Sequence, residues 1–564
     1  MELSTAQQNV CRHVRYQKRN IRSVRLGEAA VKYQTGTLKT GKGKIIPGEL
    51  TTFAPPGSGF AYDTIFEVTK LRYVQLKQRE AVSEIMASKY GFHISTGSVS
   101  HLSWQGLAYL EQCHFLKHIE LRKYYRKTCF FIHLDGTCEG NSYNHFTVRD
   151  GMTGNILYAD KIKSEHHRTI GIILQNVKEL FGVPDAVISD MSPAISKAVK
   201  EVFPHTPHKI CHFHFLKNIG IKLMLEIHDR MKRSVKSFRR DLTKMRNDML
   251  KKSGIKTTEE SDNKINEYEW FISIIDRIND FERDLNAEGF PFDLSCQAFY
   301  ERCTEINNLL TVIIQTPENK NMKIMQEINY LNNQIQRHIE YTNPDIKQLT
   351  KMNDIFSELK NILKSNEKHT DIPLNWGLLE DSVDVEDMDS KLSDLQDKAE
   401  RKTKYKSISK YEFHAWKTVF KQLKKYRKAL IPKISKDGKT IILPKTNNLC
   451  EIGFRKTKRK LRLMTGNSKL SKQLNDLPSQ FFYIENLEDP EYVKTVFGNE
   501  ETFEMFSEVN SDNVRNTMNE MKRQRMSSIG INHKLIRDDD YLEKLESYFT
   551  SDHVGTDHSI TEAA

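Results

Sequence analysis

Two aspartates stand at the ends of short apolar runs, a position that suits metal-dependent chemistry. Asp135 ends the run TCFFIHLD and Asp190 ends DAVISD, and a turn follows each of them. Carboxylates that close neighbouring buried strands lie together at the rim of a sheet, where they repel each other unless a cation neutralises them. Their oxygens favour Mg²⁺ or Mn²⁺ over zinc, and two such ions about 3.5–4 Å apart catalyse in-line phosphoryl displacement. Either aspartate alone is also explained as a turn residue or a helix N-cap.

A third carboxylate stands at the start of a basic helix. The segment LPKTNNLCEIGFRKTKRKLRLMTG begins with turn residues and continues as a helix, with Glu451 near its start. An acid followed by many cations suits a metal site that binds a phosphate backbone. The predicted backbone contacts are Arg455, Lys458, Arg459 and Arg462. A solvated basic surface, with Glu451 complementing the helix dipole, is the alternative.

The elements that must hold these acids follow an α/β order. Three strands are predicted first (TCFFIHLDGT, NHFTVRD and ILYADKI), then the helix HRTIGIILQNVKELFG, the strand DAVISD, the helix SPAISKAVKEVF and the strand HKICHFHF. This order predicts a mixed five-stranded sheet with helices. The long segment that follows has few glycines and is almost wholly helical in pattern, which predicts a large all-α insertion.

Two helices joined by a short turn precede the core. LKQREAVSEIMASKY and STGSVSHLSWQGLAYL flank the turn GFHI, and Ser95 or Thr96 caps the second helix. This is the signature of a helix-turn-helix, whose second helix enters the major groove of DNA. The residues predicted to read base edges are Ser98, His101 and Gln105. Plain helix packing explains the same pattern without DNA.

Charge and composition narrow the partners and the compartment. The first fifty residues carry ten Lys/Arg against three acids, which indicates a mobile arm, a small DNA-facing module or a solvated tail. The whole chain of 564 residues has a net charge of +12, which favours a polyanionic partner. There is no apolar run of membrane length and no secretory leader pattern, and the eight cysteines are scattered. We therefore expect no membrane association and a reducing, prokaryotic cytoplasm.

In their order, these motifs resemble the Mutator-like element transposases and their prokaryotic insertion-sequence relatives. The resemblance is carried by LDGT around Asp135, VISDMSPAISKAV around Asp190, PHKICHFHFLKN, and TNNLCEIGFRKTKRKLR around Glu451. It implies a ribonuclease H-like core in which Asp135, Asp190 and Glu451 form the catalytic, metal-binding triad with two Mg²⁺ or Mn²⁺ ions. It also implies that Cys211 and His214 lie near the active site, in a role that it does not define.

Cys211, His212 and His214 together also raise the possibility of zinc. A single Cys-x-x-His lacks the second pair of ligands that a structural zinc site requires, and no clear partner pair follows in the sequence. We therefore do not expect a stable zinc site.

The resemblance, together with the pattern, divides the chain into six parts. These are a basic arm or small DNA-binding module (1–60), a helix-turn-helix domain (61–125), the first part of the core (126–225), a helical insertion (226–439), the last core helix with the catalytic Glu (440–470) and a C-terminal region (471–564). The implied function is a transposase that binds the terminal repeats of its element, cleaves a strand and joins the 3′-hydroxyl to target DNA. The implied partners are double-stranded DNA and further copies of the chain, in a homodimer or higher assembly.

Two other functions remain open. One is a non-catalytic DNA-binding regulator derived from a transposase, against which the three intact acids argue. The other is a ribonuclease H-like structure-specific nuclease without strand transfer. Only an assay with pre-cleaved DNA ends separates that nuclease from a transposase.

Overall fold

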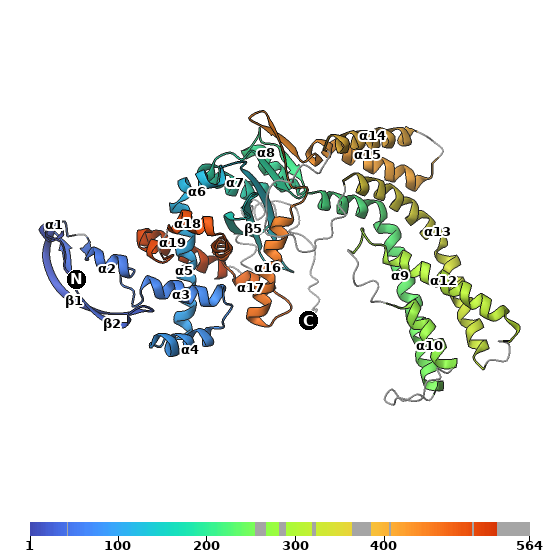
Figure 1. The fold of residues 1–564 in the computed structure, drawn as a ribbon, viewed down its shortest axis with the longest axis horizontal. Helices are drawn as coiled ribbons and strands as arrows, with labels where there is room; N and C mark the ends of the chain where they lie inside the picture. Colours follow the sequence, from blue (N-terminus) through green and yellow to red (C-terminus); the bar gives the residue numbers. More distant parts are fainter. Residues whose placement is uncertain are drawn as a thin grey trace, which may run out of the picture.

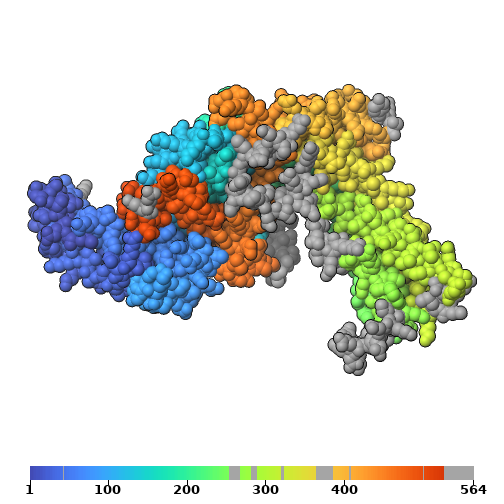
Figure 2. Space-filling model, in the orientation of Figure 1, coloured from blue at the N-terminus to red at the C-terminus, as the bar shows by residue number. Residues whose placement is uncertain are grey.

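The structure is a computed structural model that extends from a strand ribbon at one end to long helices at the other (Figure 1). It describes residues 1–41, 43–253, 267–280, 289–318, 323–363, 385–404, 408–498 and 501–526. The space-filling view shows the same outline, with the N-terminal strands and the long helices at opposite ends (Figure 2). Within these ranges, no helix is both long enough and apolar enough to cross a bilayer.

A mixed five-stranded sheet forms the centre, in the order β6-β5-β4-β7-β8. Its strands are β4 Phe131–Thr137, β5 Asn144–Asp150, β6 Ile156–Ile162, β7 Ala186–Ser189 and β8 His208–Ile210. β5 pairs antiparallel with both β4 and β6, whereas β7 pairs with β4, and β8 with β7, in parallel. Helices α7 His167–Phe181 and α8 Pro193–Val202 provide the crossovers. This sheet with its helices fits the ribonuclease H-like core that the sequence predicts.

The two faces of the sheet differ in polarity because side chains alternate along each strand. On β4, Ile132 and Leu134 point into the large hydrophobic core that α7 and α8 complete. His133 and Asp135 point to the opposite face, next to Thr147 and other polar residues of β5. That polar face is covered by α16 Asn448–Thr465, the helix that carries Glu451.

The helices before the sheet and the elements at the end of the chain share one core. The earlier helices are α3 Tyr62–Tyr73, α4 Arg79–Tyr90, α5 Thr96–Leu116 and α6 His118–Tyr125. The later elements are α17 Ser471–Asp476, η2 Ser479–Glu488, α18 Pro490–Phe497, η3 Glu504–Glu508 and α19 Ser511–Met526. Tyr109 of α5 stacks on Phe506 of η3, with 4.7 Å between the ring centroids. The long helix α5 is therefore packed between the helices that precede the sheet and the elements that follow α16.

The basic N-terminal segment forms strands over most of its length. β1 Cys11–Ser23 and β2 Gly27–Leu38 make an antiparallel ribbon, and β3 Lys44–Ile45 adds a short third strand. Two short helices flank them, α1 Thr5–Asn9 and α2 Gly48–Phe53. Most of β1 is exposed, so the low apolar periodicity of its sequence reflects a ribbon that meets solvent on both faces. The ribbon lies at the end of the molecule farthest from the long helices (Figure 1).

Between β8 and β9, every element that the structure describes is a helix. These are α9 His212–Ser253, α10 Glu267–Ile278, α12 Ser295–Gln315, α13 Met325–Leu363, α14 Val385–Lys404 and α15 Lys410–Leu430. They share a second hydrophobic core. The short hairpin β9 Lys433–Lys436 and β10 Lys439–Ile442 then leads the chain back to α16.

The predicted strand HKICHFHF is shorter than its sequence suggested. β8 ends at Ile210, and α9 begins at His212. Phe215, Leu216 and Ile219 recur at helical spacing and are buried in the core of the long helices. The alternating apolar residues of this segment therefore belong to the first turns of a helix rather than to a strand, which corrects the prediction.

Candidate active site

Asp135 and Asp190 lie on neighbouring parallel strands. Leu134 of β4 is paired with Ser189 of β7, so the residue that follows each of them stands at the same level of the sheet. Asp135 accepts a hydrogen bond from the backbone N–H of Gly136 at 2.8 Å. Asp190 accepts one from the N–H of Ser192, also at 2.8 Å, where α8 begins. Both side chains are half-buried, just beyond the last paired residues of β4 and β7. Asp190 directly follows its strand as predicted, whereas β4 continues past Asp135 to Thr137, which corrects the predicted strand end.

Asn447 connects the beginning of α16, through hydrogen bonds, to the strand that carries Asp135. Its side-chain amide donates to the carbonyl of Leu134 at 3.0 Å, and its amide oxygen accepts from Nδ1 of His133 at 2.8 Å. Asn447 is fully buried, so these bonds form away from competing water. They hold the first turn of α16, and with it Glu451, over the polar face beside Asp135. From the sequence pattern, Asn447 is predicted only to be a turn residue.

Cys211 and His214 contact the same part of α16. The backbone N–H of Asn447 donates to the sulfur of Cys211 at 3.2 Å. His214 Nε2 lies 3.7 Å from a carboxylate oxygen of Glu451. His212 points elsewhere and donates from Nε2 to the carbonyl of Leu430 at 2.6 Å. The two residues that the family resemblance associates with the active site therefore hold and face the helix of Glu451.

Asp135 lies within electrostatic reach of the other two carboxylates. Burial raises the pKa of Asp135 well above its usual range, and the negative charges of Asp190 and Glu451 raise it further. Glu165, which the sequence reading did not single out, adds to the same effect. Uncompensated carboxylates of this kind suit a divalent cation with oxygen ligands. Among the described residues, however, no three His, Cys, Asp or Glu side chains gather at metal-binding distance.

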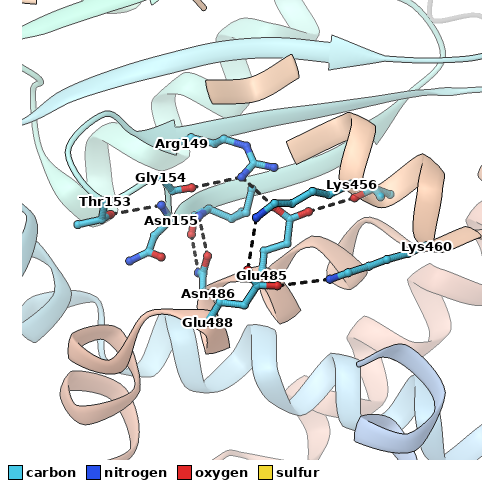
Figure 3. Close-up of polar contacts among 11 residues, drawn as sticks. Arg149, Thr153, Gly154, Asn155, Lys456, Lys460, Glu485, Asn486 and Glu488 are labelled. Carbon is cyan, nitrogen blue, oxygen red and sulfur yellow. Dashed lines mark hydrogen bonds and ion pairs between the residues drawn. The ribbon is translucent and has the colours of Figure 1, made fainter. Parts of the chain in front are cut away.

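A buried ion pair fixes the middle of α16 on the sheet (Figure 3). Arg149 of β5 pairs with Glu485 of η2 at 2.9 Å, and their side chains are 3% and 13% exposed. Arg149 also donates to the carbonyl of Gly154 at 3.2 Å, and Glu485 accepts from the hydroxyl of Thr457 at 3.0 Å. We call these four residues the Arg149 network. It joins β5, η2 and α16.

Gly453 lets α16 approach this network closely. A β-carbon at position 453 would lie 2.3 Å from Nη2 of Arg149 and 2.6 Å from its guanidinium carbon. Further along the helix, Lys456 and Lys460 pair with Glu488 at 3.6 Å and 3.5 Å (Figure 3). The position of Glu451 thus depends on contacts at both the first turn and the middle of α16.

The four predicted phosphate contacts on α16 fall into two pairs. Lys458 donates to the carbonyl of Cys138 at 3.2 Å, and Arg462 lies 3.4 Å from Glu139. Arg455 and Arg459, one helical turn apart, are exposed and make no ion pair with any described residue. Arg455 and Arg459 are therefore the pair available to a polyanion.

The predicted base-reading residues lie on α5 but differ in exposure. The side chain of Ser95 caps α5 and accepts from the N–H of Ser98 at 3.1 Å, and the two hydroxyls lie 3.0 Å apart. Ser98 and Gln105 are half-buried, whereas His101 is exposed. The turn between α4 and α5 begins at Gly91 in the left-handed conformation, which glycine adopts without strain. α5 extends to Leu116, six residues beyond the predicted end at Leu110.

Comparison with known families identifies the region around the two aspartates. Residues 131–218 match the model described as the MULE transposase domain. Residues 175–343 match a second model, described as a transposase. The first match contains the whole five-stranded sheet, with Asp135, Asp190, Cys211 and His214, whereas Glu451 lies outside both matches. No curated protein matches the chain.

Proposed function

We propose that the chain is a transposase of the Mutator-like and insertion-sequence kind, because two of its regions match transposase family models. In this proposal it cleaves DNA at the ends of an element and joins the 3′-hydroxyl to target DNA. The observation that supports this most directly is the placement of Asp135 and Asp190 at one level of neighbouring parallel strands. Glu451 stands in the first turn of α16, and its negative charge raises the pKa of Asp135. In this proposal the three residues are the catalytic carboxylates.

The proposed cofactor is Mg²⁺ or Mn²⁺, bound by the oxygens of Asp135, Asp190 and Glu451. When bound, such ions supply an activated oxygen nucleophile and stabilise the leaving oxygen. The protein's own contribution is to orient the carboxylates. The N–H groups of Gly136 and Ser192 hold the two aspartates, and Asn447 holds the first turn of α16.

We also propose roles in DNA binding and assembly for the remaining elements. α4 and α5 are proposed to act as a helix-turn-helix that reads the terminal repeat, with His101 as the most accessible reader. The helices from α9 to α15 are proposed to form an insertion between the second aspartate and the glutamate. By analogy with the family, in which two DNA ends are held together, a dimer or higher assembly is part of the proposal.

A strand-transfer assay tests the proposal. The purified chain is incubated with Mg²⁺ and a duplex that ends in a free 3′-hydroxyl, taken from the terminal repeat that flanks the gene, together with supercoiled target DNA. We expect joined products, and we expect chelation of the metal to abolish them. Nicking without joining would instead indicate a structure-specific nuclease. Binding without either reaction would indicate a regulator.

The outer face of α16 should contribute phosphate contacts. Replacing Arg455 and Arg459 with Gln should lower affinity for all DNA sequences alike and reduce the log–log salt slope by about two units, since each lost phosphate contact removes about 0.9. The matched control is the double change of Lys456 and Lys460 to Gln, which removes the same charge from the same helix but from side chains that already pair with Glu488. Equal salt slopes for the two variants, measured by fluorescence anisotropy, would contradict this assignment.

A further inference from the structure

A groove of about 1100 Å³ separates the helices around α5 from the end of α16. One side is lined by α3, α4 and α5, including His101 and Trp104, and the other by α16, α17 and α19. In the ribbon view, α16 and α17 lie beside α3 to α5 (Figure 1). The groove therefore connects the predicted reading helix with the helix that carries Glu451.

Positive charge dominates this groove. Its cations are Arg72, Arg79, Lys472, Lys522 and Arg525, against the two acids Glu80 and Asp476. Asp476 is already paired with Arg525 at 3.5 Å, and the guanidinium of Arg525 lies over the ring of Trp104. Arg79, Lys472 and Lys522 are exposed and form no ion pair within the described ranges.

Two of these cations, Arg72 and Arg79, line the same groove close enough for mutual repulsion. Like charges gathered in a concave surface raise the local potential and attract a polyanion. A bound chain of phosphates would relieve this repulsion, because each phosphate contact neutralises one cation.

α16 sets the distance between the groove and the carboxylates. Leu461 and Met464 line the groove, ten and thirteen residues after Glu451 on the same helix. At 1.5 Å per residue, this separation is about 15–20 Å along the helix axis. Since successive base pairs are about 3.4 Å apart, it corresponds to roughly four to six base pairs of duplex.

We propose that this groove binds the phosphate backbone of the element's duplex about four to six base pairs from the cleaved end. The inference rests on the proposed function and adds to it a binding surface that fixes the register of the end relative to the carboxylates. Arg79, Lys472 and Lys522 supply the phosphate contacts, and His101 lies where the same stretch of duplex presents its base edges.

The test combines a charge-neutralised protein with charge-neutralised DNA. The protein variant replaces Arg79, Lys472 and Lys522 with Gln. The control replaces Lys123, Lys200 and Lys439, three exposed lysines outside the groove, with Gln. Each protein is titrated with the terminal-repeat duplex, either unmodified or with methylphosphonates four to six base pairs from the end, or twelve pairs from it. Circular dichroism and thermal melting confirm that both variants are folded.

We expect the groove variant to lose about 2.7 units of salt slope, about 0.9 for each of three contacts. Raising the salt from 50 to 200 mM should then lower its affinity by a factor about 40 times smaller than for the wild type. Methylphosphonates near the end should weaken wild-type and control binding but leave the groove variant unaffected. Methylphosphonates at twelve pairs should affect all three proteins alike. A groove variant that keeps the wild-type salt slope, or that responds to the near substitutions as the wild type does, would overturn the proposal.

A competition experiment identifies the polyanion that occupies the groove. Single-stranded RNA and polyglutamate are added as competitors at equal charge concentration. If either of them displaces the duplex, the occupant is not duplex DNA and the proposal is overturned.

Measurements of strand transfer separate this inference from the proposed function. If strand transfer fails in the wild type while the groove effects persist, the proposed function is wrong and the groove still binds duplex. If strand transfer occurs and the groove variant binds DNA as the wild type does, only the proposal about the groove is refuted.

Discussion

Asp135→Asn is expected to abolish strand cleavage and joining while leaving DNA binding intact. The substitution keeps the shape of the side chain and an oxygen that can accept the Gly136 N–H bond, but it removes one of the charges proposed to bind the metal ion. Metal ions contribute several kcal/mol to phosphoryl transfer, and each 1.4 kcal/mol is tenfold in rate, so we expect a loss of about a thousandfold or more. Cleavage of an end-labelled duplex in Mg²⁺ measures it.

Asp190→Asn and Glu451→Gln should behave in the same way, because all three carboxylates act on one site. The control is Glu179→Gln, which removes an exposed carboxylate from α7 and should leave cleavage unchanged. Thermal stability gives a second readout. Because each substitution removes one of several repelling charges, the melting temperature should stay equal or rise. A variant that loses activity and also melts at a lower temperature would therefore be recognised as unfolded. Strand transfer at the wild-type rate by any of the three variants would remove that residue from the proposed triad.

Gly453→Ala is expected to destabilise the protein strongly. The new methyl group would lie 2.3 Å from Nη2 of Arg149, whose Nη1 is held in the ion pair with Glu485, so relieving the contact must displace either this buried guanidinium or α16. Breaking a buried ion pair costs about 3–5 kcal/mol. If α16 moves instead, Glu451 moves with it, so cleavage should fall even in the fraction that stays folded. Denaturant titration and cleavage by the purified variant measure the two effects.

Gly171→Ala is the matched control for this prediction. Gly171 lies inside α7, and nothing approaches within 4 Å of the position that its β-carbon would take. Alanine is favoured over glycine in a helix interior by about 0.5–1 kcal/mol, so this variant should be slightly more stable than the wild type. If Gly453→Ala proved as stable and as active as Gly171→Ala, the Arg149 network would not determine the position of α16.

The strand ends were predictable from the sequence because their signal is local. An apolar run that ends in Asp and a turn indicates the end of a strand. Asp190 directly follows β7 as predicted, whereas β4 continues two residues beyond Asp135 to Thr137 because it stays paired with β5 there. The order of strands and helices around them predicted the mixed sheet in the same way. Glu451 has no such local signal, since a first-turn glutamate in a basic helix is common on surfaces. Its assignment needed the family resemblance.

The residues that hold Glu451 in place were not predictable because their partners are distant in sequence. Arg149 appears in the strand NHFTVRD as an ordinary polar residue, and only the folded chain brings Glu485 to it. Asn447 stands in a run of turn residues, and its bonds to β4 cross about 300 residues of sequence. Local pattern identifies side chains that end an element, whereas buried polar pairs depend on the tertiary contact that desolvates them.

The stacking of Tyr109 on Phe506 has a consequence for synthesis of the protein. About 400 residues separate the two rings, so at 5–20 residues per second the ribosome adds the second one about 20–80 s after the first. Throughout that interval, the apolar side of α5 lacks the C-terminal elements that complete its core. A cell that makes this protein must keep that surface from aggregating, through chaperones or a slow supply of nascent chains. Its yield should therefore depend on expression rate as well as on stability.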